Sequence, residues 1–213
     1  MYAKRKTFII LILAIGLLYS IGCEAINTNA KETVAYISRN NDSNYEKTFK
    51  ELNLGKIFDY KYKLENANKT GVSLWLEGYE NGEKIDPNPL RAYNYYLNPN
   101  KNSEEGKLGF GIVNSSDKNS SIFFYSPSSA VQPMDFNFTF NENNNIYTWR
   151  NAINDKTFEV KKGEEIILAV YREIKGNELT HYDYQKSDSI KEIIDKDSKV
   201  LLFKFKIYDL SER

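Results

Sequence analysis

The stretch "FDYKYKL", residues 58–64, decides the fold class of this chain. Aromatic or aliphatic residues alternate in it with charged ones: Phe58, Tyr60, Tyr62 and Leu64 against Asp59, Lys61 and Lys63. Successive side chains of a β-strand point to opposite faces, so a period of two gathers the apolar residues on one face. The stretch therefore predicts a strand with one face in a core and the other toward solvent.

Similar runs recur to the end of the chain, separated by clusters of Asn, Asp, Ser, Gly and Pro. Further strands are expected at residues 72–80, 91–96, 108–113, 121–125, 134–140, 146–149, 157–160, 165–174 and 200–208. Asn81-Gly82 indicates a hairpin turn after 72–80, because both positions tolerate positive φ. A second hairpin is expected to join 157–160 to 165–174.

Only two segments have a helical pattern. Ser43 and Glu46 have capping-box spacing, and apolar residues follow at helical spacing, which predicts a helix at 44–54. Ser189 and Glu192 repeat that spacing before a second short helix. The chain is thus expected to be all-β: an immunoglobulin-like β-sandwich of about 8–10 short antiparallel strands with two short helices. A closed barrel is the alternative.

The N-terminus has a basic segment at residues 4–6, an apolar run at 8–18, and then the only cysteine of the chain. This arrangement resembles a bacterial lipoprotein signal peptide. The resemblance covers residues 1–23 only. Its lipobox-like motif is Ser20-Ile21-Gly22-Cys23, where the family prefers Leu at the first position. The resemblance implies cleavage before Cys23 and attachment of membrane-embedded acyl chains to its sulfur.

This interpretation divides the chain into a signal peptide (1–22), a lipid-anchored tether (23–42) and a β-sandwich domain (43–213). Val34, Tyr36 and Ile37 within the tether have the composition of a first short strand. An uncleaved anchor and a secreted product cut elsewhere are the alternatives. All three place residues 24–213 on the extracytoplasmic side of a bacterial membrane.

Charge and rare residues exclude several functions. The chain has 29 basic and 29 acidic residues, and without the signal peptide the net charge is −3. Nothing therefore indicates the basic patch of a nucleic-acid-binding protein. One cysteine permits no internal disulfide and no cysteine-based metal cluster. The single histidine, His181, is expected to be a solvated loop residue between a strand and a helix.

Acidic residues are the remaining source of catalytic chemistry. Two carboxylates at suitable separation can hydrolyse a glycoside, and Asp59, Glu77, Asp135 and Glu159 all lie on expected strands. Each occupies the polar phase of its strand, which favours a solvated face. Loops 141–145 and 195–197 offer oxygen ligands for calcium but lack an EF-hand pattern. No cofactor or metal is expected.

Exposed aromatic residues are the best candidates for a contact surface. Trp75 is out of phase with its apolar neighbours on the strand, and Tyr79 shares its face. Tyr93, Tyr95 and Tyr96 beside Arg91 form a second candidate, since aromatic faces stack on sugar rings. The alternative is that the sandwich or a covering loop buries these rings.

The sequence thus predicts a lipid-anchored cell-envelope protein that is a non-enzymatic binding module for an envelope protein or a glycan. One alternative is a structural or accessory subunit of an envelope complex, which a large exposed apolar patch would indicate. Another is a carboxylate-dependent glycan hydrolase, indicated by a cleft that holds two acids.

The Cys23→Ala variant tests the anchor. Without the thiol that accepts the diacylglycerol, we expect no metabolic lipid labelling and an unprocessed precursor. Labelling with a radioactive fatty acid and the gel mobility of the protein measure both effects. Persistent labelling of the variant would rule out the lipoprotein interpretation.

Overall fold

The computed structural model describes residues 32–97, 100–113, 120–140 and 146–212. The compact unit of the fold is Lys31–Arg213. The expected signal peptide, Cys23 and the loop at 141–145 lie outside the described residues. None of the described helices is long and apolar enough to cross a membrane.

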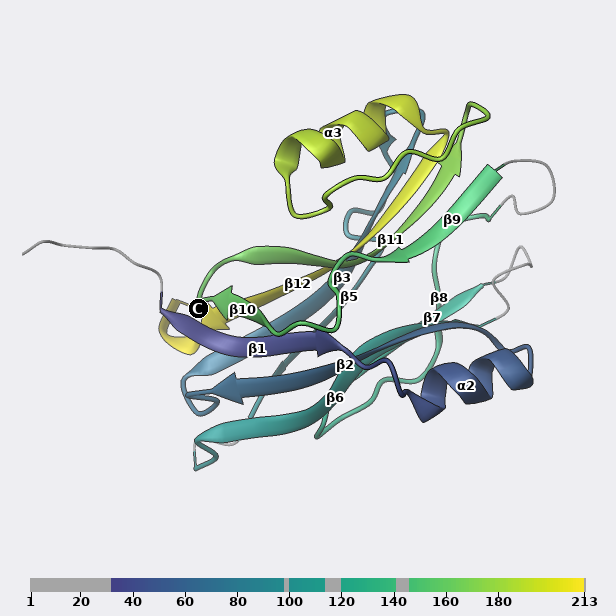
Figure 1. Cartoon of the computed structure of the whole chain (residues 1–213). Coiled ribbons are helices and arrows are strands. Elements are labelled where there is room, and N and C mark those ends of the chain that lie inside the picture. The colour runs from purple at the N-terminus through teal and green to yellow at the C-terminus, as the bar shows by residue number, and fades with distance from the viewer. Residues whose placement is uncertain (1–31, 98–99, 114–119, 141–145, 213) are drawn as a thin grey trace, which may run out of the picture. The chain divides into compact units, whose positions relative to one another are not determined.

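The described chain folds into two antiparallel sheets, which confirms the all-β sandwich (Figure 1). Sheet A has the order β10 (Phe158–Lys161), β1 (Thr33–Arg39), β2 (Gly55–Glu65), β6 (Ser103–Val113), β7 (Ser121–Tyr125) and β8 (Met134–Asp135). Sheet B has the order β4 (Glu83–Lys84), β3 (Thr70–Glu80), β12 (Lys199–Asp209), β11 (Glu165–Ile174) and β9 (Ile146–Asn151), and β5 (Arg91–Tyr96) also pairs with β3. The helices are α2 (Asn44–Glu51), α3 (Ser187–Lys196) and a 3₁₀ turn, Leu210–Glu212.

Aromatic rings fill the space between the sheets. Phe110 of sheet A stacks on Phe203 of sheet B with ring centroids 3.9 Å apart, and Phe58 packs on Phe110 at 5.0 Å. The hydroxyl of Tyr60 crosses from β2 and donates to the Leu168 carbonyl on β11 (2.8 Å). The alternation in residues 58–64 thus places its aromatic members in the core, as expected.

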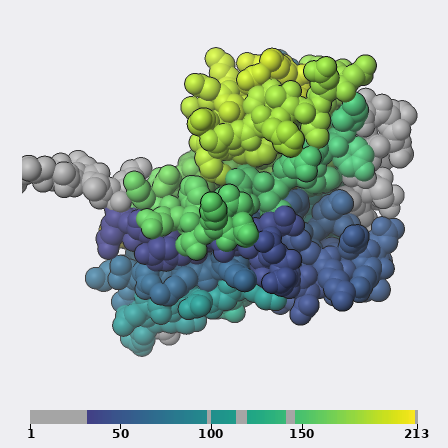
Figure 2. Space-filling model, viewed as in Figure 1, coloured from purple at the N-terminus to yellow at the C-terminus, as the bar shows by residue number. Residues whose placement is uncertain are grey.

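Part of the outer face of sheet B is apolar as well, and α3 covers that part. The second hydrophobic cluster joins the two: Tyr79, Ile167, Val170, Tyr184, Ile193, Val200 and Leu202. A buried ion pair between Arg172 and Asp197 (2.6 Å) fixes the end of α3 to β11. In Figure 2 the yellow-green residues of α3 and the segment before it stand as a thick layer above the rest of the described domain.

The structure confirms one of the two predicted hairpins, and it moves the expected boundary between tether and domain. Asn81 (φ 52°) and Gly82 (φ 91°) adopt positive φ between β3 and β4, which confirms the predicted turn. The second predicted hairpin is wrong, because β10 pairs with β1 in sheet A while β11 belongs to sheet B. The expected tether end at residue 42 is also wrong, since β1 pairs on both sides inside sheet A.

Two other elements are shorter or shifted. The expected strand at 134–140 ends at Asp135, although its rings at 136, 138 and 140 are all buried in the core. The alternation in this segment thus predicted correctly which rings are buried, but it did not predict where strand pairing ends. The predicted capping box at Ser189 is wrong, because α3 begins at Ser187 and its N-cap, Lys186, makes no side-chain cap bond.

The ring stack between the sheets can be tested with Phe203→Ala. Removing this ring leaves a cavity in the centre of the core, and we expect a loss of about 3–5 kcal/mol of unfolding free energy. Leu52→Ala is the control, because Leu52 is 64% exposed and should change stability by about 0.5 kcal/mol or less. Urea unfolding followed by circular dichroism measures both. Equal effects would contradict this core.

Candidate binding site

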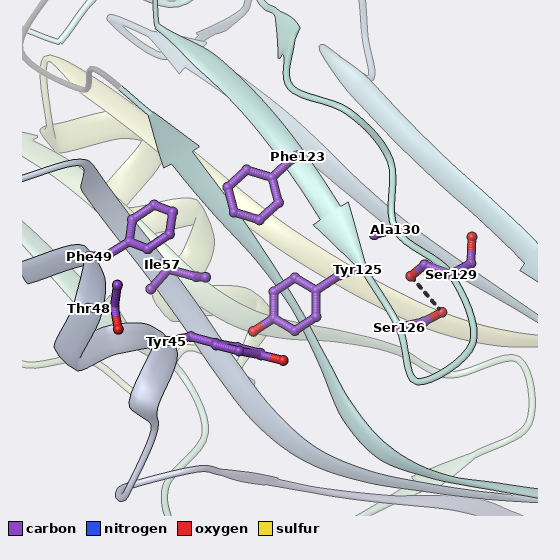
Figure 3. A pocket seen from close by; sticks show the side chains of 9 residues that line it. All are labelled: Tyr45, Thr48, Phe49, Ile57, Phe123, Tyr125, Ser126, Ser129 and Ala130. Atoms are coloured by element: carbon purple, nitrogen blue, oxygen red, sulfur yellow. Dashed lines mark hydrogen bonds between the residues drawn. The ribbon is translucent and has the colours of Figure 1, made fainter. Parts of the chain in front are cut away.

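An apolar hollow of about 550 Å³ lies between α2 and the outer face of sheet A. We call it the α2 groove. Tyr45, Thr48, Phe49, Ile57, Phe123, Tyr125, Ser126, Ser129 and Ala130 line it. Figure 3 shows Tyr45 and Phe49 on the helix side and Phe123 and Tyr125 on the β7 side. This volume lies within the usual range of about 300–1,000 Å³ for ligand pockets.

Two glycines on β6 lie beneath the rings of Phe123 and Tyr125, which form the floor of the α2 groove. Gly109 pairs with Tyr125 and Gly111 with Phe123. A Cβ on Gly111 would collide with the Phe123 ring, and a Cβ on Gly109 would collide with the Phe58 carbonyl and come within 2.6 Å of the Tyr125 hydroxyl. The two rings can therefore lie over β6 only because these positions have no side chain.

A buried carboxylate holds the floor and the helix together. Asp59, on the outer face of β2, is fully buried and accepts three side-chain hydrogen bonds. Its donors are Asn40 Nδ2 (2.8 Å), Ser43 Oγ (2.5 Å) and Tyr125 OH (2.9 Å). The expectation of a solvated Asp59 is wrong, because α2 and the residues before it cover this part of β2.

Ser43 couples the carboxylate to the helix. Its hydroxyl donates to Asp59 and accepts from the backbone N–H of Glu46 (3.1 Å), as expected for an N-cap. Glu46 accepts from Arg39 (3.3 Å) instead of capping back. The helix then ends at Glu51, before Asn53 adopts positive φ (52°), so it stops earlier than the expected end at residue 54.

The acid also fixes the direction of Tyr125. Burial and the nearby Asp59 carboxylate raise the pKa of Tyr125 well above its usual value. Its hydroxyl therefore stays protonated at any physiological pH and remains a donor. Because that hydroxyl points to Asp59, the Tyr125 ring presents its apolar body to the groove, where it contacts Tyr45 edge to face at 5.7 Å.

The wall of the groove is a helix that buries none of its residues. Tyr45 is 44% exposed, and the half-buried Phe49 packs on Phe123 of the floor, with ring centroids 5.9 Å apart. Leu52 and Leu54 continue this exposed apolar surface past the helix end. An apolar helix face beside an open apolar hollow is a feature of binding surfaces.

The aromatic residues that the sequence predicted as contact residues lie outside the α2 groove, and they are on different faces of sheet B. Tyr93 and Tyr95 point into the core, where they stack on each other at 5.3 Å, so their prediction as contact residues is corrected. The alternation of β5 turns Tyr96 the other way, and this ring is 61% exposed on the outer face of sheet B. The three tyrosines therefore do not form one platform.

Trp75 and Tyr79 do lie on the face opposite the core, as predicted, but Tyr79 is in the part of that face that α3 covers. Tyr79 is buried in the cluster under α3, so its prediction as a contact residue is corrected. Trp75 is half-buried, with Lys204 Nζ 5.7 Å from its ring centroid. A contact role for Trp75 and Tyr96 stays a prediction.

Glu77 lies between these two rings in a hydrogen-bonded group. Burial alone would raise the pKa of Glu77, but the group around it lowers the pKa below the usual value. Trp75 Nε1 donates at 3.0 Å, Tyr79 OH donates at 2.9 Å, and the Lys204 ammonium lies 3.1 Å away. A carboxylate held ionised in this way is a poor general acid.

The four carboxylates considered for glycoside hydrolysis are not brought together. Asp59 and Glu77 lie on different sheets, and Asp135 and Glu159 lie on β8 and β10, at opposite edges of sheet A. Asp135 and Glu159 are exposed. Three further hollows of the described chain are lined by none of these four residues.

The metal and histidine expectations have simple outcomes. His181 is exposed in the loop between β11 and α3, as predicted. In segment 195–197 the Asp197 carboxylate is bound to Arg172, while segment 141–145 is outside the described residues. Within the described parts of the chain, no group of three or more His, Cys, Asp or Glu side chains is placed to hold a metal ion.

Comparisons with family models, curated proteins and solved structures gave no match for this chain. Its fold and the α2 groove are therefore interpreted from its own geometry.

Sequence reasoning missed the α2 groove, although its parts were visible. The helical spacing of Tyr45 and Phe49 was used only to predict a helix. The informative signal was Gly109 and Gly111 in one phase of a strand, because glycine inside a strand indicates close approach of another group. Which side chains fill the space above these glycines depends on which strand pairs with β6. The sequence does not specify that pairing.

The hydrogen bonds of Asp59 can be tested with Asp59→Asn. All three side-chain partners donate, so an amide NH₂ group would face a donor, and we expect a loss of about 2–3 kcal/mol of unfolding free energy. Asp135→Asn is the matched control: that carboxylate is exposed and accepts one bond from Ser121, so about 0.5 kcal/mol or less is expected. Urea unfolding measures both, and a similar small change in both variants would contradict the role of Asp59.

Proposed function

We propose that this chain is a lipid-anchored protein on the extracytoplasmic face of a bacterial membrane, and that its domain is a non-enzymatic binding module. The α2 groove is its binding site. Gly22-Cys23 after a basic and an apolar segment supports the anchor. The exposed apolar face of α2 beside the ring-lined floor carries the proposal for binding.

The chemistry of the groove lining supports binding over catalysis. Four aromatic rings and three small hydroxyl residues line it, and none of the lining residues is an acid or a histidine. The Asp59 carboxylate, which contacts the lining residue Tyr125, uses its oxygens to hold Asn40, Ser43 and Tyr125. Large aromatic side chains in a preformed hollow supply most of the energy in many interfaces.

A second candidate function is an accessory subunit of an envelope complex. The continuation of the apolar surface from Phe49 to Leu52 and Leu54 favours it, because a surface longer than the hollow suits a protein partner. The glycan hydrolase has no such support, since the candidate acids lie on four separate strands.

Tyr45→Ser tests the binding site. A soluble form from Glu24 contains the whole compact unit Lys31–Arg213 and can be added to isolated envelopes of the source bacterium. Because Tyr45 forms part of the helix wall, we expect its truncation to weaken saturable binding at least about tenfold, which corresponds to about 1.4 kcal/mol. Sedimentation of the envelopes with labelled domain measures the binding.

Tyr147→Ser is the matched control. Tyr147, on β9, is 39% exposed and makes one aromatic contact, to Tyr171, much as Tyr45 contacts Tyr125. We expect the control to bind like the unmodified domain. Equal binding by all three proteins would contradict the α2 groove as the binding site.

A further inference from the structure

Part of the outer face of sheet B lies beyond α3. Figure 1 shows this helix over the end of the sheet where β3 stops and β12 starts, and the second hydrophobic cluster lies beneath it there. Toward the other end, strand pairing sets the outward positions of β5, β3 and β12 in three rows. The rows are Tyr96, Gly71 and Tyr208; Asn94, Ser73 and Lys206; and Ala92, Trp75 and Lys204. We call these residues the β3 face.

Three aromatic rings stand on the β3 face. Tyr96 is 61% exposed, and Trp75 and Tyr208 are half-buried. A Cβ on Gly71 would lie 2.2 Å from Cζ of Tyr208, so this ring extends over β3 only because the position has no side chain. Tyr96 pairs with Gly71 from the other side, so the two tyrosines flank the same glycine. Trp75 is four residues further along β3, a distance of roughly 13 Å, so the rings follow this strand in two groups.

The row between the two groups of rings is polar. The Ser73 hydroxyl donates to the side-chain oxygen of Asn94 (2.5 Å). Asn94 is exposed, and its NH₂ group has no hydrogen-bond partner within the described parts of the chain. The Lys206 ammonium, third in the row, lies 3.5 Å from Glu165 on β11. This part of the surface therefore offers both donors and acceptors of hydrogen bonds.

Both cations of the β3 face have acids beside them. Lys204, which lies 5.7 Å from the centroid of the Trp75 ring, is 3.1 Å from Glu77 and 3.6 Å from Glu165. Glu165 is also the partner of Lys206. Lysines compensated in this way do not attract an anionic ligand by charge, so this surface selects by ring stacking and hydrogen bonds instead.

This combination matches the chemistry of a sugar chain. A pyranose ring has a face of C–H groups that stacks on aromatic rings, and its hydroxyls donate and accept hydrogen bonds. A protein partner fits the composition less well. Lys, Ser and Ala, which the β3 face contains, are depleted in protein interfaces, and none of its residues is Leu, Ile, Val, Met or Phe.

We infer that the β3 face is a second binding site and that it takes a glycan. The rings of Trp75 and Tyr96 stack on separate sugar units of one chain, and Ser73 and Asn94 form hydrogen bonds with hydroxyls between them. The separation of the two ring groups requires an oligosaccharide, because one sugar ring is too short to reach both. The α2 groove lies on the outer face of sheet A, so this site does not depend on it.

Tyr96→Ser and Trp75→Ala test the two groups of rings. The probe is the insoluble cell-wall glycan of the source bacterium, freed of protein by protease digestion, and sedimentation measures binding of the soluble domain. Because each variant loses one stacking ring, we expect binding to weaken at least about fivefold. A urea unfolding curve checks that each variant is folded. Tyr96→Ser decides the test if Trp75→Ala is unstable, because Trp75 is hydrogen-bonded to Glu77 whereas Tyr96 is the most exposed of the three rings.

Tyr147→Ser and Tyr45→Ser are the matched controls. Tyr147 lies on β9, at the opposite edge of sheet B from β5, and Tyr45 lies in the α2 groove. We expect both variants to bind the protein-free glycan within about twofold of the unmodified domain. If Tyr45→Ser loses binding while Tyr96→Ser keeps it, the glycan belongs to the α2 groove and the second site is ruled out. Equal binding by all variants, or no binding by the unmodified domain, would also overturn the inference.

A protein and a membrane surface are the other possible occupants of the β3 face. Whole envelopes are therefore compared before and after protease digestion, and vesicles of phosphatidylglycerol supply a lipid surface without glycan. We expect the binding that depends on Tyr96 to survive digestion and to be absent on the vesicles. Loss of this binding on digestion would identify a protein partner, and its presence on the vesicles would identify the membrane surface. Either result would overturn the inference.

Discussion

The stack of Phe58, Phe110 and Phe203 between the two sheets is the contact on which the rest of the structure depends. Once these rings occupy the inner face, the period of two sends their sequence neighbours to the outer face. Asp59, Gly109 and Gly111 therefore stand together on the outside of sheet A, although they come from two strands. The α2 groove is thus a consequence of the core's register, and a shift of one residue would remove it.

The two outer faces of the sandwich show different solutions to the same problem. On sheet B, apolar residues of β11 and β12 face outward, and α3 buries them together with its own Ile193. On sheet A, α2 buries none of its residues and is held mainly through polar groups, Ser43 to Asp59 and Glu46 to Arg39. A helix that packed for stability alone would cover the rings of β7, as α3 covers β11.

Local patterns predicted most of the strands and one of the two helix caps, because alternation and turn chemistry act over a few residues. Strands at 91–96 and 121–125, the Asn81-Gly82 turn and the Ser43 cap were all correct. Long-range pairing was not predictable in this way: Gly163 joins two sheets where a hairpin was expected, and Tyr79 lies under a helix more than 100 residues later in the chain. Asp59 looked like any polar-phase residue, since its burial depends on a helix that precedes it.

The polar attachment of α2 has a consequence for energetics. The floor of the groove is rigid, because Tyr125 is held by Asp59 and both rings lie against backbone without side chains. The wall contributes little apolar burial to folding, so its apolar side chains still have most of their transfer free energy to gain. A ligand of the proposed site would bury the parts of Tyr45 and Phe49 that are still exposed, and it would bind only the folded state. Binding of such a ligand would therefore raise the unfolding free energy of the domain. The increase grows with the logarithm of the ratio of ligand concentration to dissociation constant, and α2 is the element through which this stabilisation acts.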